Sequence, residues 1–128
     1  MIGSSGDVRP MEISKQEELR ARRKRFARRI IRLFRSLPHS PDAEGLGKQL
    51  LRSGTSVGAI IKAAGRARSQ SEFRARIGIV LEEADEVVFW LECLVDSGIA
   101  KEELLTDLLK EANDLVAIFA ASYQTARR

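Results

Sequence analysis

Few residues in this chain carry the chemistry of catalysis, disulfide bonding or sheet formation. Its 128 residues include one cysteine, one histidine and three prolines, and aromatic residues make up only 5%. The single cysteine, Cys93, excludes an internal disulfide and agrees with a reducing compartment, so we expect a cytoplasmic protein. The low aromatic and proline content favours helices over a β-sandwich.

Long hydrophobic runs are also missing. The longest uninterrupted apolar stretch covers residues 115–121, far short of the ~20 residues that a membrane-spanning helix needs. The N-terminal residues lack the charged and then apolar regions of a signal peptide. We therefore expect one globular domain with no membrane partner, since 128 residues suffice to bury a core.

Apolar residues recur at helical spacing in four consecutive segments, and no segment alternates with a period of two. The pattern predicts a disordered leader over residues 1–13 and then a bundle over 14–126, with helices at 14–37, 42–67, 70–97 and 101–125. Because the three links are short, neighbouring helices must be antiparallel. The predicted fold class is all-α, an up-down-up-down four-helix bundle.

Local signals support the predicted helix ends. Pro41 suits the first turn of the second helix. Ser69 followed by Glu72 is a capping pattern that indicates the start of the third helix. Gly98 is a candidate for the left-handed residue that ends it.

Candidate catalytic and metal-binding groups are few. His39 lies between prolines in a predicted turn with no second histidine, and Cys93 has no His or Lys nearby to activate it. The acidic residues of the third predicted helix lack the histidines that di-iron bundles use. Residues 45–48 do not form a phosphate-binding loop, because Asp42 and Gln49 stand where that loop needs Gly and Ser or Thr. We therefore expect a non-enzymatic protein without a metal or cofactor.

Charge is divided along the chain. Residues 1–68 carry 16 Lys and Arg against 6 Asp and Glu, and residues 69–128 carry 6 against 12, so the net charges are +10 and −6. The first predicted helix bears a stripe of arginines opposite its apolar side, with two more beside it: Arg25, Arg28, Arg32 and Arg35, flanked by Arg22 and Arg29. Guanidinium groups bind phosphate oxygens in pairs, so these six are the candidate nucleic-acid-binding residues.

Any such contact with RNA or DNA should be directed to the backbone, because the arginine stripe contains no outward aromatic residue for base stacking. Two further interpretations of the stripe stay open. A charged stripe is often a solvated helix face. The basic first helix can also dock on the acidic third and fourth helices of a neighbouring copy, which would give a protein–protein scaffold or assembly module without a nucleic-acid role.

One segment interrupts the apolar pattern with small residues. Residues 49–59 read Gln-Leu-Leu-Arg-Ser-Gly-Thr-Ser-Val-Gly-Ala. Gly54 and Gly58 lie one turn apart, and each costs about 1 kcal/mol relative to alanine in a helix interior. We expect them to permit close approach of another helix, or to form a pocket or subunit contact.

This segment, followed by residues 69–73, 83–86 and 90–91, resembles the bacterial four-helix-bundle family encoded in intervening sequences of large-subunit ribosomal RNA genes. The resemblance covers about residues 20–122. Ile60 and Ala63 depart from it, because family members commonly carry Asn and Glu there. The family-motif and packing positions of this chain are Gln49, Arg52, Ser53, Gly54, Ser56, Gly58 and Ala59.

The resemblance also implies an assembly and partners. Members of the family are similar to small cytosolic proteins that form five-fold rings of four-helix bundles. A related group, the accessory variability proteins of diversity-generating retroelements, comprises basic pentamers that bind nucleic acid and the element's reverse transcriptase. By resemblance, we expect a homopentameric accessory protein that binds RNA or DNA, with a reverse transcriptase as a candidate partner.

Overall fold

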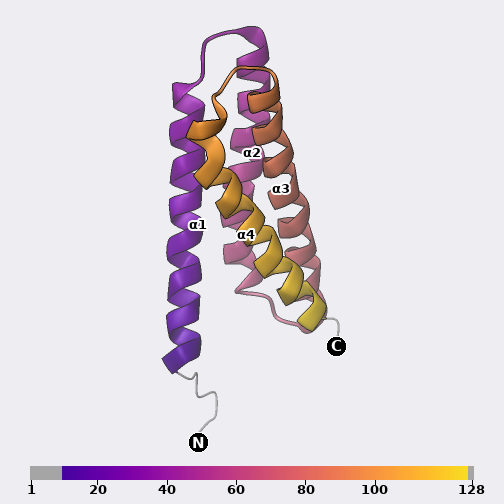
Figure 1. Cartoon of the computed structure of the whole chain (residues 1–128). Coiled ribbons are helices and arrows are strands. Elements are labelled where there is room, and N and C mark those ends of the chain that lie inside the picture. Colours follow the sequence, from indigo (N-terminus) through magenta and orange to yellow (C-terminus); the bar gives the residue numbers. More distant parts are fainter. Residues whose placement is uncertain (1–9, 127–128) are drawn as a thin grey trace, which may run out of the picture.

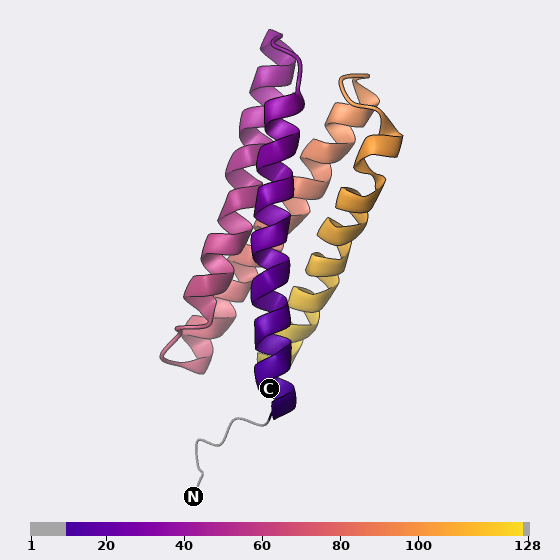
Figure 2. The ribbon, with the colours of Figure 1, turned by 90° about the vertical axis from the view of Figure 1, so that its left-hand side faces the viewer.

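The computed structural model describes residues 10–126, with side chains described from residue 17 to residue 125, and these residues form four long helices (Figure 1). The helices are α1 (Pro10–Ser36), α2 (Pro41–Ala64), α3 (Gln70–Asp96) and α4 (Glu102–Ala126). Consecutive helices run in opposite directions and are joined by short turns (Figures 1 and 2). The predicted all-α, up-down-up-down four-helix bundle is confirmed.

The apolar stripes of the four helices meet in one core. Every helix contributes side chains with almost no exposed surface, among them Phe26, Leu50, Leu91 and Leu115. Burial of these stripes stabilises the helices more than intrinsic helix propensity does. Helix α1 packs chiefly on α2, α2 on α3 and α3 on α4, whereas α1 touches α4 over a short stretch. The outward side of α1 is therefore left free of other helices.

The ends of α3 follow the local signals in the sequence. The Ser69 hydroxyl oxygen accepts a hydrogen bond of 3.1 Å from the backbone N–H of Glu72. The Glu72 carboxylate accepts from the N–H of Arg68 and not from that of Ser69, so one of the two bonds of a capping box forms. Gly98 has a φ of +73°, which confirms the predicted left-handed residue after α3.

Two observed helix ends differ from the predicted bounds by more than one residue. Helix α1 begins at Pro10 and not near residue 14. Proline is well tolerated in the first helical turn, because a backbone N–H there has no partner within the helix. Helix α2 ends at Ala64, where tight backbone bonds from Arg66 to Ala63 and from Ala67 to Ala64 replace the helical pattern. Residues 1–9 of the predicted leader lie outside the described residues.

Within residues 10–126, none of the helices combines the length and the apolar character needed to cross a membrane.

Candidate functional site

Five of the six candidate arginines lie on the outer side of α1. We call them the arginine face: Arg25, Arg28, Arg29, Arg32 and Arg35. Arg29 is half-buried and the other four are exposed. Among the side chains of residues 17–125, none of these five forms an ion pair. The arginine face therefore presents guanidinium groups over more than two helical turns.

Arg22, the sixth candidate, is occupied within the chain. Its Nη2 lies 2.7 Å from Oε1 of Glu111 on α4, and its Nε donates to Oε2 at 3.2 Å. The two side chains are only 20% and 17% exposed. The hydrogen bond to Glu111 raises the pKa of Arg22 above its ordinary value. Arg22 therefore ties α1 to α4, which the sequence pattern alone did not indicate.

The glycines of α2 lie against α1. A Cβ atom at Gly54 would lie 2.7 Å from Cγ2 of Ile30, too close without a shift of the backbone or the isoleucine. Gly58 is less tight, and its carbonyl oxygen accepts a 3.2 Å hydrogen bond from Nη1 of Arg23. Gly47 also lies close to the end of α1, since a Cβ atom there would lie 2.8 Å from Cδ1 of Leu37. Sequence reasoning missed Gly47, whose spacing of seven residues from Gly54 was the available signal.

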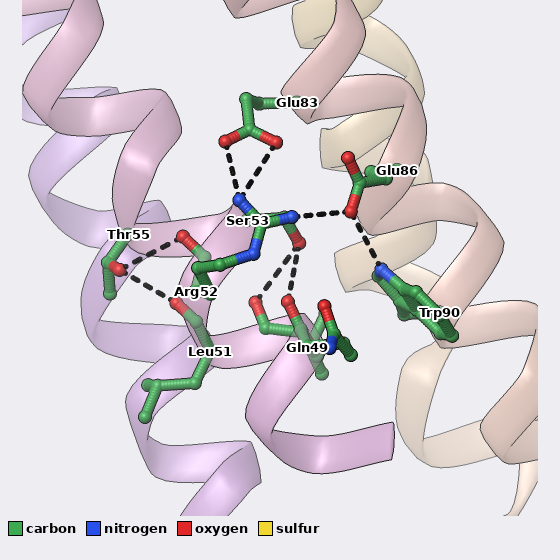
Figure 3. Close-up of polar contacts among 9 residues, drawn as sticks. Gln49, Leu51, Arg52, Ser53, Thr55, Glu83, Glu86 and Trp90 are labelled. Atoms are coloured by element: carbon green, nitrogen blue, oxygen red, sulfur yellow. Dashed lines mark hydrogen bonds and ion pairs between the residues drawn. The ribbon is translucent and has the colours of Figure 1, made fainter. Parts of the chain in front are cut away.

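A polar network joins the middle of α2 to α3 (Figure 3). Arg52 lies 3.0 Å from Oε2 of Glu83 through Nη1 and 2.5 Å from Oε1 of Glu86 through Nη2. The same oxygen of Glu86 accepts a 3.2 Å hydrogen bond from the indole N–H of Trp90. The bonds from Trp90 and Arg52 lower the pKa of Glu86 below its ordinary value. Because Arg52 is half exposed, solvent screens these pairs, and the network orients side chains more than it stabilises the fold.

The remaining residues of the small-residue segment have separate environments. Ser53 is fully buried, and its hydroxyl donates to the backbone oxygens of Gln49 and Leu50 at 3.0 and 3.3 Å. Ser56 is half-buried, whereas Gln49 and Ala59 are exposed. The segment thus has one side in the core and one side, with Gln49, Arg52 and Ala59, at the surface.

The sequence matches a known protein family over most of its length. The family model described as 23S rRNA-intervening sequence protein matches residues 15–121. This chain belongs to the 23S rRNA-intervening sequence protein family.

A solved structure has the same architecture as this member of the 23S rRNA-intervening sequence protein family. It is a protein of unknown function from the S23 ribosomal protein family of Bacteroides thetaiotaomicron, with a TM-score of 0.76 and 30% sequence identity. The match covers 81% of this chain and 96% of that chain. No curated protein matches the chain.

Three of the stretches that carried the resemblance to the intervening-sequence proteins meet in space. Arg52 belongs to the segment on α2, and Glu83, Glu86 and Trp90 belong to the stretches on α3. Their spacing in the sequence therefore reflects a contact between helices. In this contact the side chains of α2 and α3 orient one another. The contact does not by itself indicate a chemical activity.

The few potential catalytic groups are dispersed in this 23S rRNA-intervening sequence protein. His39 is exposed in the turn between α1 and α2, and Cys93 is a half-buried free thiol on α3. Within the described part of the chain, no three His, Cys, Asp or Glu side chains are grouped in a way that could hold a metal ion. The arginine face is thus the candidate site with the clearest chemistry, which is attraction of anions.

Proposed function

We propose that this protein is a non-enzymatic, homo-oligomeric accessory protein that binds nucleic acid through the arginine face of α1. The observation that carries the proposal is the exposure of Arg25, Arg28, Arg32 and Arg35 on one side of a helix that no other helix covers. Guanidinium groups suit the phosphate oxygens of a nucleic-acid backbone because their planar forks bind two oxygens at once.

Binding of this kind reads the backbone and not the bases. The aromatic residues of this part of α1 point elsewhere, since Phe26 is buried in the core and Phe34 lies against Gly47 of α2. With five arginines on phosphates, the logarithm of the affinity falls against the logarithm of salt with a slope near −4.5 for duplex DNA and about −3.5 for single strands. Within RNA or within DNA, molecules of unrelated sequence should bind with similar affinity.

The assembly and the protein partner are proposed from the family resemblance. We propose a homopentamer, in which five arginine faces act together and convert weak single contacts into avidity. A reverse transcriptase of a diversity-generating retroelement is the proposed protein partner. Sedimentation or native mass measurement tests the ring, and a monomer at micromolar concentration contradicts it.

A matched pair of variants tests nucleic-acid binding. R28Q/R32Q removes two charges from the arginine face, and K48Q/K101Q removes two exposed charges outside α1. We expect R28Q/R32Q to weaken the binding of labelled RNA and to reduce the salt slope by about 0.7 to 0.9 for each phosphate that the variant no longer neutralises. The control should bind like the parent protein. Equal binding by both variants, or binding that does not depend on salt, contradicts the proposal.

A second candidate function is a protein–protein scaffold without a nucleic-acid role. It is favoured by two large apolar side chains at the surface of α3, Phe89 at 53% and Ile79 at 47% exposure. Phe89 also contacts Trp90 edge to face, with ring centroids 4.9 Å apart. Exposed aromatic residues of this kind are enriched at protein interfaces. An assembled protein that binds neither RNA nor DNA at low salt supports this function over the first.

A further inference from the structure

A second basic surface lies away from the arginine face, where the end of α2 meets the start of α3. An open hollow of about 690 Å³ is lined there by four basic side chains, one carboxylate and two alanines. The basic side chains are Lys62 and Arg66 from the end of α2 and its turn, Arg68 from the same turn, and Arg76 from α3. None of these four was identified from the sequence. The volume falls within the range of sites that hold small ligands.

The charges around the hollow do not cancel within the chain. Arg76 is held in place, because it pairs with the Glu72 carboxylate at 2.6 Å and donates to the backbone oxygen of Ala63. This pair neutralises the only carboxylate of the lining. Glu72 also accepts from Arg68, but through the backbone N–H, which leaves the guanidinium of Arg68 unused in that bond.

Three cationic side chains then remain without a charged partner among residues 17–125, namely Lys62, Arg66 and Arg68. All three are exposed and border the same hollow. Like charges held close together cost free energy, and an anion placed between them removes that cost. Arg and Lys side chains arranged around one concave surface are suited to phosphate oxygens, which accept several charge-assisted hydrogen bonds.

We propose that this hollow is a phosphate-binding site, with Lys62, Arg66 and Arg68 as its cationic ligands. The Arg76–Glu72 ion pair lines one side of the site and does not bind the phosphate. The phosphate belongs either to the backbone of a bound nucleic acid, in which case the inference rests on the proposed function, or to a small phosphorylated molecule. In the first case each subunit holds a nucleic acid at two separate places, and the strand passes both α1 and the turn between α2 and α3.

The experiment uses the full chain and two probes. Sodium pyrophosphate is titrated by calorimetry, and labelled RNA is titrated by fluorescence anisotropy at several salt concentrations. The test variant is R66Q/R68Q, and the matched control is K48Q/K101Q, which removes the same charge from positions outside the hollow. Because both substituted side chains of the test variant are exposed, we expect thermal unfolding of all proteins to be alike. Lys62→Gln serves as an independent third variant.

We expect R66Q/R68Q to lose binding of at least one probe, while the control keeps it. Loss for RNA, with a salt slope reduced by about 1 for each phosphate released, assigns the phosphate to a nucleic-acid backbone. Loss for pyrophosphate alone assigns it to a small ligand. If R66Q/R68Q and Lys62→Gln bind both probes as the control does, the inference is overturned.

The two proposals can fail separately, because different variants test the arginine face and the hollow. One outcome is that R28Q/R32Q weakens RNA binding, that R66Q/R68Q and Lys62→Gln do not, and that no variant changes pyrophosphate binding. This outcome supports the proposed function and overturns the phosphate site in the hollow. If R66Q/R68Q and Lys62→Gln weaken RNA binding and R28Q/R32Q does not, the phosphate site is supported and α1 is rejected as the nucleic-acid surface.

Discussion

At the scale of single residues, Gly54 sets the distance between two helices. A Cβ atom there would lie 2.7 Å from Cγ2 and 2.8 Å from Cγ1 of Ile30. Ile30 is fully buried and branched at Cβ, so it has little freedom to rotate away. Gly45 lies in the same helix, but nothing stands within 4 Å of the Cβ atom that it would gain. These two glycines offer a direct test of whether close packing or helix propensity decides the effect of alanine.

We expect Gly54→Ala to destabilise the protein and Gly45→Ala to stabilise it. Alanine gains about 1 kcal/mol of helix propensity at either position. At Gly54 this gain is opposed by overpacking, which costs about 1 to 3 kcal/mol, so the free energy of unfolding should fall by about 1 kcal/mol. Gly45→Ala should raise it by about 0.5 to 1 kcal/mol. Urea unfolding of the two variants measures both changes, and stabilisation by Gly54→Ala would show that α1 can move away without cost.

At the scale of helices, local signals in the sequence predicted the elements, their order and their antiparallel neighbours, but not the side-chain pairs between helices that are distant in the chain. Ser69 and Gly98 mark the ends of α3 because caps depend on residues close in the chain. The bond between Arg22 and Glu111 joins residues 89 positions apart, so no local pattern reveals it. In the sequence Arg22 is one arginine among several on α1, and only the packed bundle distinguishes it from Arg25.

We expect Arg22→Gln to destabilise the bundle, while Arg25→Gln leaves its stability within about 0.5 kcal/mol. The first substitution leaves Glu111 without its bidentate partner in a site where both side chains are mostly covered. The cost should lie between that of exposed and fully buried pairs, at about 1 to 2 kcal/mol. Urea unfolding near neutral pH compares the two variants. Equal stability of the two variants would mean that the Arg22–Glu111 pair contributes nothing to the free energy of unfolding. Arg22 would then again be a candidate nucleic-acid-binding residue.

At the scale of the whole molecule, the basic and acidic residues that the sequence divides between its two halves lie mostly on different helices of the bundle. Some of the acidic residues of the second half are neutralised within the chain, since Arg22 pairs with Glu111 and Arg52 pairs with Glu83 and Glu86. The basic residues of the arginine face and of the hollow between α2 and α3 keep most of their charges unpaired among the described side chains, with Arg76 as the exception. These basic residues are thus gathered on two surfaces, where the local positive charge is denser than a net charge of +4 spread over the whole protein suggests.

Salt separates the two possible neighbours of the arginine face, a polyanion and a second subunit. At about 1 M salt the Debye length is near 3 Å, so contacts between exposed charges are screened. If the arginine face binds nucleic acid and the subunits meet elsewhere, RNA should be released while the assembly stays intact. Sedimentation with and without labelled RNA, at low salt and at high salt, measures both. If the assembly dissociates at high salt, and R28Q/R32Q dissociates it at low salt, the arginine face lies between subunits and the nucleic-acid function of α1 is excluded.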